Sequence, residues 1–273
     1  MPDNSWWAVG GSVGGAAGAR LPRFFAAAAQ IDAQAGQARL VGGDVRHIRD
    51  VLRRRAGDGI VVCDGSGTDY ICSIAVLGKA EIAADIVEIR PSAGEPAVQA
   101  VLWQCLPKGD KFDRIVRQTV EAGVHEIIPV ASARALHSDL PAEPNLALEH
   151  RLSRWQRISE EAAKQSGRGR VPRVGKPAYF IDAVRQCSRI QGTFSIIPYE
   201  ECAGQTLKLA LSGRGAGVSR IDVFIGPEGG FAPEEVALAQ DAGIEPVTLG
   251  PRILRTETAG LAAISAIMYE REA

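Results

Sequence analysis

Two segments near the C-terminus carry most of the residues whose types and spacing could support chemistry. The first, residues 225–235, has the sequence IGPEGGFAPEE and directly follows an apolar run. Its three glycines would let backbone groups approach a ligand closely, and Glu228 adds a carboxylate. The spacing is that of neither a Walker loop nor a dinucleotide-binding fingerprint. We interpret this segment as a ligand-binding loop; the simpler alternative is an ordinary glycine-rich turn.

The second segment, residues 249–259, has the sequence LGPRILRTETA and also lies between an apolar run and a helical pattern. Arg252 and Arg255 fall in its loop, and Thr256 or Thr258 could cap the helix that follows. On their own, these residues could be two solvated arginines and a helix cap. Because both segments follow predicted strands, we expect them to lie at the ends of neighbouring strands and to line one pocket.

Positive charge gathers in three other stretches, although the formal net charge of the 273 residues is −1. Residues 106–111 contain two lysines, residues 46–55 contain five arginines, and residues 151–173 hold seven basic side chains against two acidic ones. Such runs are most often solvated faces. Arginines that cluster locally on a near-neutral chain are nevertheless compatible with RNA binding. The net charge excludes a protein that is basic over its whole surface.

The hydrophobic pattern predicts the elements that would position these segments. Residues 21–90 indicate a small β-rich domain with a short helix over residues 44–55, capped by Asp44. Its strands are expected at residues 60–63, 70–77 and 80–89. Proline and glycine in residues 91–97 indicate a linker, and residues 1–20 show no periodicity and are expected to form a flexible extension.

From residue 98 to residue 273, strands and helices alternate. Strands are expected at residues 98–104, 125–130, 193–197, 221–225 and 244–249. Helices are expected at residues 112–120, 148–165, 205–211, 233–241 and 258–269. The alternation predicts an α/β domain with a mostly parallel sheet covered on both faces, whose ligands bind beyond the carboxyl ends of the strands.

Several classes of protein are disfavoured. No apolar run is long enough to span a bilayer and no secretory signal is visible, so we expect a cytoplasmic protein without a membrane partner. The five cysteines and four histidines lack ligand spacing, so no metal site is predicted. Residues 60–67 look like the first glycine motif of Rossmann-type methyltransferases, but a β-rich stretch follows where a helix is needed, which favours a hairpin turn.

Five stretches of the chain resemble the family called ribosomal RNA small subunit methyltransferase E, which belongs to the SPOUT superfamily. They run in the family's order, and the last two together are highly specific. They are residues 47–58, 106–130, 154–172, 225–235 and 249–259. The glycine-rich extension is not part of the family pattern, and residues 131–137 fit it poorly around Arg134.

The resemblance implies a fold and a reaction. The fold is α/β, with an N-terminal PUA-like β-barrel and a C-terminal SPOUT domain that contains a deep trefoil knot. The implied cofactor is S-adenosyl-L-methionine, in a pocket completed at a homodimer interface. The implied product is N3-methyluridine in 16S rRNA, with the rRNA within the small ribosomal subunit as the partner.

The resemblance also implies roles for individual residues. Arg255 or Arg252 would stabilise the uracil anion, and Glu257 would act as the base or orient the arginine, with Glu228 as the second candidate. The expected cofactor-binding residues are Pro198, Tyr199, Glu200, Gly226, Pro227, Glu228, Gly229, Gly230, Leu249, Gly250, Ile253, Leu254 and Thr256. The expected RNA-binding residues are Arg23, Arg46, Arg53, Lys108, Lys111, Lys164, Gln165, Arg168 and Arg170.

Two other functions compete with this interpretation. The chain could be a SPOUT 2′-O-ribose methyltransferase acting on tRNA or rRNA, which would yield a chemically different nucleoside. It could also be a non-catalytic RNA-binding protein with a vestigial pocket, although the two intact loops argue against that. A nucleotide-binding oxidoreductase is disfavoured because the glycine spacing is wrong.

Overall fold

The computed structural model describes residues 21–135, 146–190, 192–213 and 217–272. The predicted flexible extension therefore lies outside the described residues. The chain divides into two compact units: Met1–Glu95 with Gly167–Arg170, and Pro96–Ser166 with Val171–Ala273. Among the described residues, no helix is both long and apolar enough to cross a membrane.

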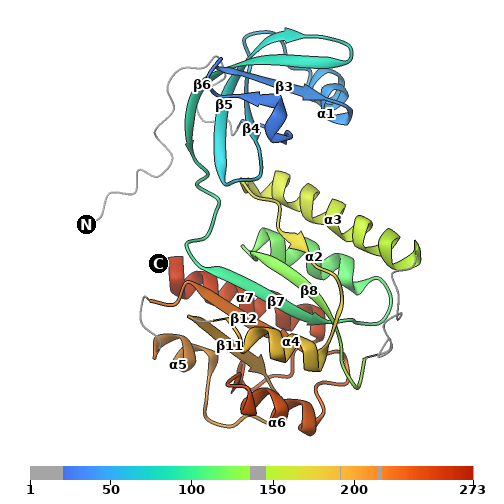
Figure 1. Ribbon diagram of the computed structural model, residues 1–273, viewed down its shortest axis with the longest axis vertical. Coiled ribbons are helices and arrows are strands. Elements are labelled where there is room, and N and C mark those ends of the chain that lie inside the picture. The colour runs from blue at the N-terminus through green and yellow to red at the C-terminus, as the bar shows by residue number, and fades with distance from the viewer. Residues whose placement is uncertain (1–20, 136–145, 191, 214–216, 273) are drawn as a thin grey trace. The chain divides into compact units, whose positions relative to one another are not determined.

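The first unit is a six-stranded sheet with the order β1-β4-β5-β6-β3-β2 (Figure 1). Its strands are β1 (Arg23–Phe25), β2 (Ile31–Asp32), β3 (Gln37–Val41), β4 (Gly59–Cys63), β5 (Thr68–Leu77) and β6 (Glu81–Pro91). Only β1 and β4 pair in parallel. A short helical turn, η1 (Ala28–Gln30), precedes β2. Alternate side chains of β3, β4 and β5, among them Leu40, Ile60 and Ile74, form the apolar core of this unit.

The glycine-bearing turn after β4 is a hairpin turn, as the β-rich sequence beyond it predicted. Strand β4 pairs antiparallel with β5, and Cys63 lies opposite Asp69 across the turn. No helix begins there, so the arrangement that would present a cofactor to a helix N-terminus is missing at this turn. The first unit therefore does not contain a Rossmann-type site at residues 60–67.

The predicted helix over residues 44–55 is shorter than expected. Helix α1 (Gly43–Arg46) continues into a wider helical turn, η2 (His47–Val51), and ends there. Asp44 does not cap it: the residue before the helix is Gly42, whose φ of +74° suits glycine and strains other residues. The helix therefore begins where the glycine turns the chain, one residue earlier than the side-chain pattern suggested.

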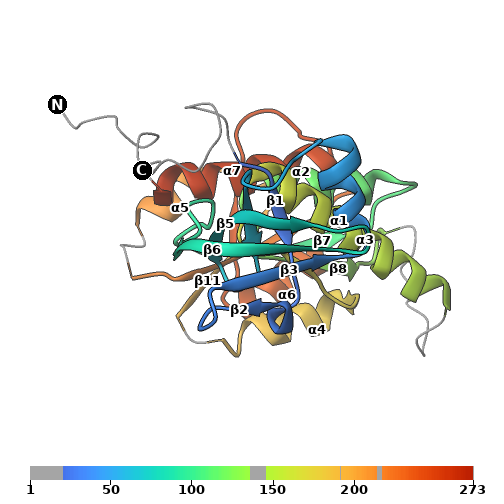
Figure 2. The ribbon, with the colours of Figure 1, turned by 90° about the horizontal axis from the view of Figure 1, so that it is seen from above.

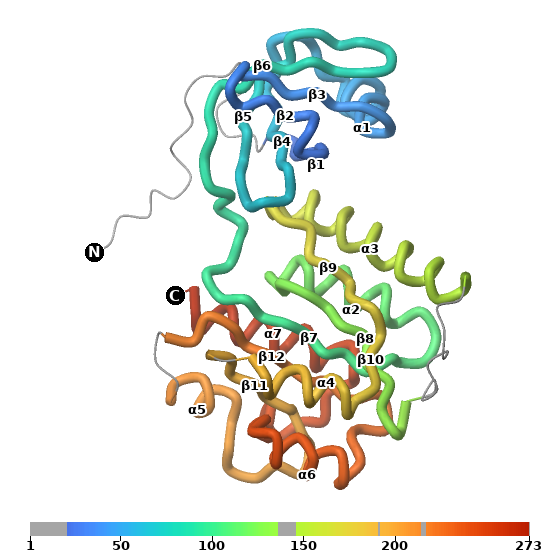
Figure 3. Tube along the Cα trace, in the orientation of Figure 1, coloured from blue at the N-terminus to red at the C-terminus, as the bar shows by residue number. Residues whose placement is uncertain are grey.

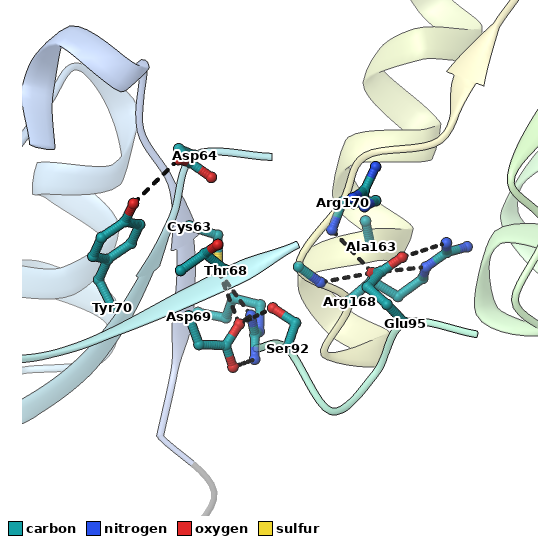
Figure 4. A network of polar contacts seen from close by, with 12 residues as sticks. Cys63, Asp64, Thr68, Asp69, Tyr70, Ser92, Glu95, Ala163, Arg168 and Arg170 are labelled. Carbon is teal, nitrogen blue, oxygen red and sulfur yellow. Dashed lines mark hydrogen bonds and ion pairs between the residues drawn. The ribbon is translucent and has the colours of Figure 1, made fainter. Parts of the chain in front are cut away.

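Residues 167–170 directly follow helix α3 (Leu146–Ser166) of the second unit but belong to the first unit. Glu95 accepts hydrogen bonds from the backbone N–H groups of Gly169 and Arg170, at 2.8 and 3.0 Å, and forms an ion pair with Arg168 (Figure 4). Next to this cluster, Ser92 donates a hydrogen bond to Asp69, which also pairs with Arg23 (Figure 4). These polar contacts explain why a four-residue loop packs on a domain from which it is distant in sequence.

The second unit contains a parallel sheet with the order β10-β8-β7-β12-β11-β13, and β9 also pairs with β8 (Figure 3). Its strands are β7 (Gln99–Cys105), β8 (Glu126–Ala131), β9 (Arg173–Val174), β10 (Ala178–Tyr179), β11 (Thr193–Pro198), β12 (Arg220–Ile225) and β13 (Glu245–Val247). The central strands β7 and β12 are almost wholly buried, as expected for a sheet covered on both sides.

Helices cover both faces of this sheet, in agreement with the predicted architecture (Figure 2). They are α2 (Lys111–Glu121), α3 (Leu146–Ser166), α4 (Phe180–Cys187), α5 (Leu207–Ser212), α6 (Pro233–Asp241) and α7 (Thr256–Glu272). Val101 and Trp103 of β7 pack in one apolar cluster with residues of α4 and α6. Leu102 and Gln104 point the other way, toward Gly260 of α7.

Several features of this unit differ from the sequence-based expectation. Helix α4 and the two-residue strands β9 and β10 were not predicted, because such short segments give too small a window for a period to stand out. The two glycine- and arginine-bearing loops do not follow neighbouring strands, because β11 lies between β12 and β13. The segment after β11 therefore stands between the two loops.

Candidate active site

Three segments that follow β11, β12 and β13 line two adjoining cavities of the second unit. The first cavity, of about 460 Å³, is lined by residues 248–254 together with residues after β11. The second, of about 610 Å³, is lined by residues 225–231, residues 253–257 and Lys111. The two cavities share five lining residues: Pro198, Glu200, Ile253, Leu254 and Ala259. They form one continuous site at the carboxyl ends of parallel strands, where ligands bind in α/β folds.

Every residue that the sequence predicted to bind the cofactor lines one or both of these cavities. Pro198, Tyr199 and Glu200, at the end of β11 and directly after it, line the first cavity together with residues of the second loop. Of the residues expected to act in the reaction, Arg255 and Glu257 line the second cavity and Arg252 lines the first. Lys111, expected to contact RNA, also lines the second cavity.

Two of the three glycines in residues 225–231 suit a tight local geometry. A Cβ on Gly230 would lie 2.6 Å from a carboxylate oxygen of Glu200, and the φ of Gly230 is +67°. A Cβ on Gly226 would lie 3.3 Å from the ring of Phe231, which is itself buried. Glycine therefore lets this loop turn back on itself while the segment after β11 approaches it.

Thr256 ties the second loop to the first. Its hydroxyl donates a hydrogen bond of 2.6 Å to the carbonyl of Gly226 and accepts one of 2.9 Å from the amide of Gln104. Because α7 begins at Thr256, this hydroxyl does not cap the helix as predicted. Both of its hydrogen bonds instead fix the start of α7 to the loop after β12 and to β7.

Two further side chains hold residues 225–235 in place, and neither was predicted to do so. Glu235 accepts hydrogen bonds of 2.9 Å from the N–H groups of Ala133 and Ala232, so it joins the segment after β8 to the start of α6. Arg134 donates a hydrogen bond of 3.0 Å to the carbonyl of Gly229. The Ala133–Glu235 and Arg134–Gly229 contacts join residues more than ninety positions apart in sequence, so no local pattern could have revealed them.

Charged groups gather in the second cavity. Lys111 Nζ lies 2.6 Å from Glu228 Oε1 and 4.0 Å from Glu257 Oε2. The hydrogen bond to Glu228 raises the pKa of Lys111. Partial burial acts to raise the pKa of Glu228, but the hydrogen bonds from Lys111 and from backbone N–H groups prevail and hold that pKa below its usual value. Both groups are therefore charged at neutral pH.

The two arginines of the second loop are available for a ligand. The side chains of Arg252 and Arg255 are exposed, and within the described chain neither guanidinium forms a hydrogen bond or an ion pair. A guanidinium stays charged at any working pH and presents its donors in a planar fork. The site can therefore offer a fixed cation, an ionised carboxylate and backbone groups to one reacting centre.

The residues expected to bind RNA divide into exposed and buried groups. Arg46, Arg53, Lys108, Gln165 and Arg170 are exposed. Lys164 is partly exposed and lies 3.0 Å from Glu160. Two arginines have structural partners instead: the Arg23 guanidinium pairs with buried Asp69, and Arg168, whose side chain is only 4% exposed, pairs with Glu95.

The lining of the first cavity fits S-adenosylmethionine, the cofactor that the resemblance implies. No atom lies within 4 Å of the position that a Cβ on Gly250 would occupy, so the backbone there borders open space. Pro198, Leu249 and Leu254 supply apolar surface for a purine, and Glu200 supplies a carboxylate that can accept hydrogen bonds from ribose hydroxyls. The residues present therefore suit an adenosine group.

Comparison with known proteins identifies the family. Residues 94–268 match the model of an RNA methyltransferase domain, and residues 41–87 match that of an RNA methyltransferase PUA domain. Two proteins named Ribosomal RNA small subunit methyltransferase E are similar over most of their length. That of Bacillus subtilis (strain 168) is 34% identical over 238 residues, which cover 85% of this chain and 90% of the relative. That of Aquifex aeolicus (strain VF5) is 30% identical over 229 residues, which cover 83% of this chain and 91% of the relative.

A solved structure supports the same family assignment. The crystal structure of a Ribosomal RNA small subunit methyltransferase E from Neisseria gonorrhoeae, bound to S-adenosyl methionine, superposes with a TM-score of 0.77 at 32% identity. The match covers 92% of this chain and 98% of that one. The loops, the parallel sheet and these relatives agree, and the chain belongs to the ribosomal RNA small subunit methyltransferase E family.

Proposed function

We propose that this protein transfers a methyl group from S-adenosylmethionine to N3 of one uridine in 16S rRNA. The observation that carries the proposal is the convergence of Arg255 and Glu257 with the glycine loop on one cavity, which adjoins the cavity that suits adenosine. The relatives support the rRNA substrate, since they are named for the small ribosomal subunit.

Backbone and side-chain groups of three segments would hold the cofactor. Leu249, Gly250 and Leu254 would enclose its adenosine, and Glu200 would accept hydrogen bonds from its ribose. When bound, S-adenosylmethionine supplies a methyl group on a positively charged sulfur. The nucleophile is the substrate nitrogen, so no nucleophilic side chain of the protein is needed.

The protein's own task is to prepare N3 of uracil. The N3–H group is a weak acid, and its lone pair becomes a good nucleophile only when the proton leaves. Arg255 would donate hydrogen bonds to a uracil carbonyl and stabilise the negative charge that develops there. Glu257 would accept the N3 proton as the new bond to carbon forms. Because N3 is hidden by base pairing, the target uridine must be unpaired or flipped out.

The proposal also covers the topology of each unit and the oligomeric state. We propose a trefoil knot in the second unit and a closed PUA-like barrel in the first. We also propose a homodimer that acts in the cytoplasm and completes the pocket. Support for the dimer comes from two exposed apolar side chains: Ile253, which borders both cavities, is 88% exposed, and Tyr269, near the C-terminal end of α7, is 80% exposed. Sedimentation equilibrium should give twice the monomer mass of 29.0 kDa.

A comparison of substrates tests the proposal. Labelled S-adenosylmethionine would be offered with small ribosomal subunits, naked 16S rRNA or tRNA, each from a strain that lacks the enzyme. We expect label in 16S rRNA, and the first two substrates show which assembly state is used. Label in tRNA would favour a different RNA methyltransferase. The absence of both transfer and cofactor binding would favour a non-catalytic RNA-binding protein.

A further inference from the structure

Lys111 occupies an unusual position between two carboxylates. It is the first residue of α2, and its side chain reaches across to Glu228 in the loop after β12. Glu228 also accepts a hydrogen bond of 3.1 Å from the backbone N–H of Lys108. One carboxylate therefore anchors both the start of α2 and the lysine side chain. A lysine held this way is poorly suited to reach out to an RNA phosphate.

The second carboxylate, Glu257, is less satisfied. It is 9% exposed, and its Oε2 atom is buried without a hydrogen-bond partner. This oxygen is the one that lies 4.0 Å from Lys111 Nζ. A buried carboxylate oxygen that has a cation near it, but no donor on it, depends on that cation to offset the cost of its burial.

The charges around Glu257 come from three segments. Lys111 contributes a cation from α2, Arg255 contributes another from the segment directly before α7, and Glu228 contributes an anion from the loop after β12. Gln104, from β7 beneath them, is uncharged, and its Oε1 has no hydrogen-bond partner. Without Lys111, Glu228 and Glu257 would be two carboxylates in one cavity with only Arg255 to balance them.

We propose that Lys111 is a positioning residue for proton transfer: held by Glu228, it keeps its ammonium group beside Glu257 and so holds that carboxylate where it can accept the N3 proton of uracil. The inference rests on the proposed function, because it takes Glu257 as the base. It assigns Lys111 to the reaction rather than to RNA binding. It also explains why the glycine loop carries a carboxylate, since Glu228 serves to hold the lysine.

A comparison of kcat with the KM for RNA tests this role. Replacing Lys111 by methionine removes the charge and keeps most of the length of the side chain. We expect kcat to fall by roughly tenfold, because Glu257 loses the cation that holds it, while the KM for RNA changes little. Lys111→Arg should restore most of the lost kcat.

Lys108→Met is the matched control. Lys108 is an exposed lysine three residues earlier, and it touches Glu228 only through its backbone. We expect this variant to raise the KM for RNA without lowering kcat. A raised KM for RNA with an unchanged kcat in Lys111→Met would overturn the inference and return Lys111 to RNA binding. Failure of the wild-type protein to transfer any methyl group would contradict the proposed function instead.

Discussion

At the scale of single residues, some side chains of the site are engaged in hydrogen bonds within the protein and others are not. Thr256, Glu235 and Arg134 form hydrogen bonds that join the loops. Arg255 is exposed and has no hydrogen-bond or ion-pair partner within the described chain. A residue whose donors are unused at a cavity wall is the better candidate for contact with a reacting base.

Arg255 should therefore be needed for turnover and not for cofactor binding. We expect Arg255→Ala to lower kcat by at least about 100-fold, the usual effect of removing one donor from a developing anion. Binding of S-adenosylmethionine, measured by calorimetry, should change little. Arg252→Ala is the matched control, because Arg252 borders the other cavity. Unchanged turnover in Arg255→Ala would remove this arginine from the mechanism.

A second residue-scale prediction concerns stability of the first unit. Burial acts to raise the pKa of Asp69, but its hydrogen bonds from Arg23 and Ser92 prevail and hold the pKa below its usual value. The stability that this ionised group contributes is therefore present above about pH 4 and is lost as the pH falls further. Asp69→Asn should cost about 3 kcal/mol at pH 7, because it leaves a largely buried arginine without its anion.

Urea unfolding of the wild-type protein and of Asp69→Asn at pH 7 and at pH 3 measures this effect. The difference in free energy of unfolding should shrink at pH 3, where the wild-type carboxyl also begins to take up a proton. Asp32→Asn is a suitable comparison, since Asp32 is exposed and accepts only backbone hydrogen bonds. A difference that does not depend on pH would show that the ionised pair is not the source of the stability.

At the scale of elements, much of the second unit follows from its hydrophobic pattern. The apolar runs placed β7, β8, β11 and β12 within one or two residues, and Pro233 marked the first turn of α6. These patterns are local: they reflect which face of each element is buried. The order of strands in the sheet is not local, so the position of β11 between the two loops could not be derived.

In the candidate site, too, the sequence predicted local features and could not predict long-range contacts. The motif in residues 249–259 indicated Arg252 and Arg255 as pocket residues, because loops after parallel strands are where ligands bind, and the family resemblance added Glu257. It did not predict that Thr256 would donate to Gly226, or that Glu235 would bind the segment after β8. Each such hydrogen bond joins residues that only the folded chain brings together.

Glu235 offers an element-scale prediction. Glu235→Ala should lower the free energy of unfolding by about 1–2 kcal/mol, because two backbone N–H groups lose their acceptor. It should also weaken binding of S-adenosylmethionine, since the glycine loop directly precedes α6. Thermal unfolding and calorimetry measure the two effects. Glu234→Ala is the control, as Glu234 is exposed and has no hydrogen bond among the described residues. Equal effects from both variants would contradict the role given to Glu235.

At the scale of the whole molecule, the chain passes three times between its two units, at Glu95, at Ser166 and at Arg170. Sequence analysis placed residues 167–170 with the second unit, because nothing local reveals the hydrogen bonds to Glu95. The structure also changes how RNA binding should be tested. Replacing Arg168 would break its ion pair with Glu95, so a loss of binding would not report a lost phosphate contact.

Arg170 is the better probe of RNA contact, since it is exposed in the same loop. We expect Arg170→Ala to weaken RNA binding and to reduce the slope of log Kd against log salt concentration by about one. Arg157→Ala serves as the control, because Arg157 is 73% exposed on α3 but is not among the expected RNA contacts. If the salt slope of Arg170→Ala equals that of the wild type, the phosphates contact another surface.

The most direct test of the central claim is the identity of the methylated nucleoside. 16S rRNA from a strain lacking the enzyme would be incubated with the protein and S-adenosylmethionine, digested to nucleosides, and analysed by mass spectrometry against standards. The account predicts N3-methyluridine with the wild-type protein and none with Arg255→Ala. A 2′-O-methyl nucleoside would contradict it, because a ribose hydroxyl would then be the nucleophile that Arg255 and Glu257 prepare.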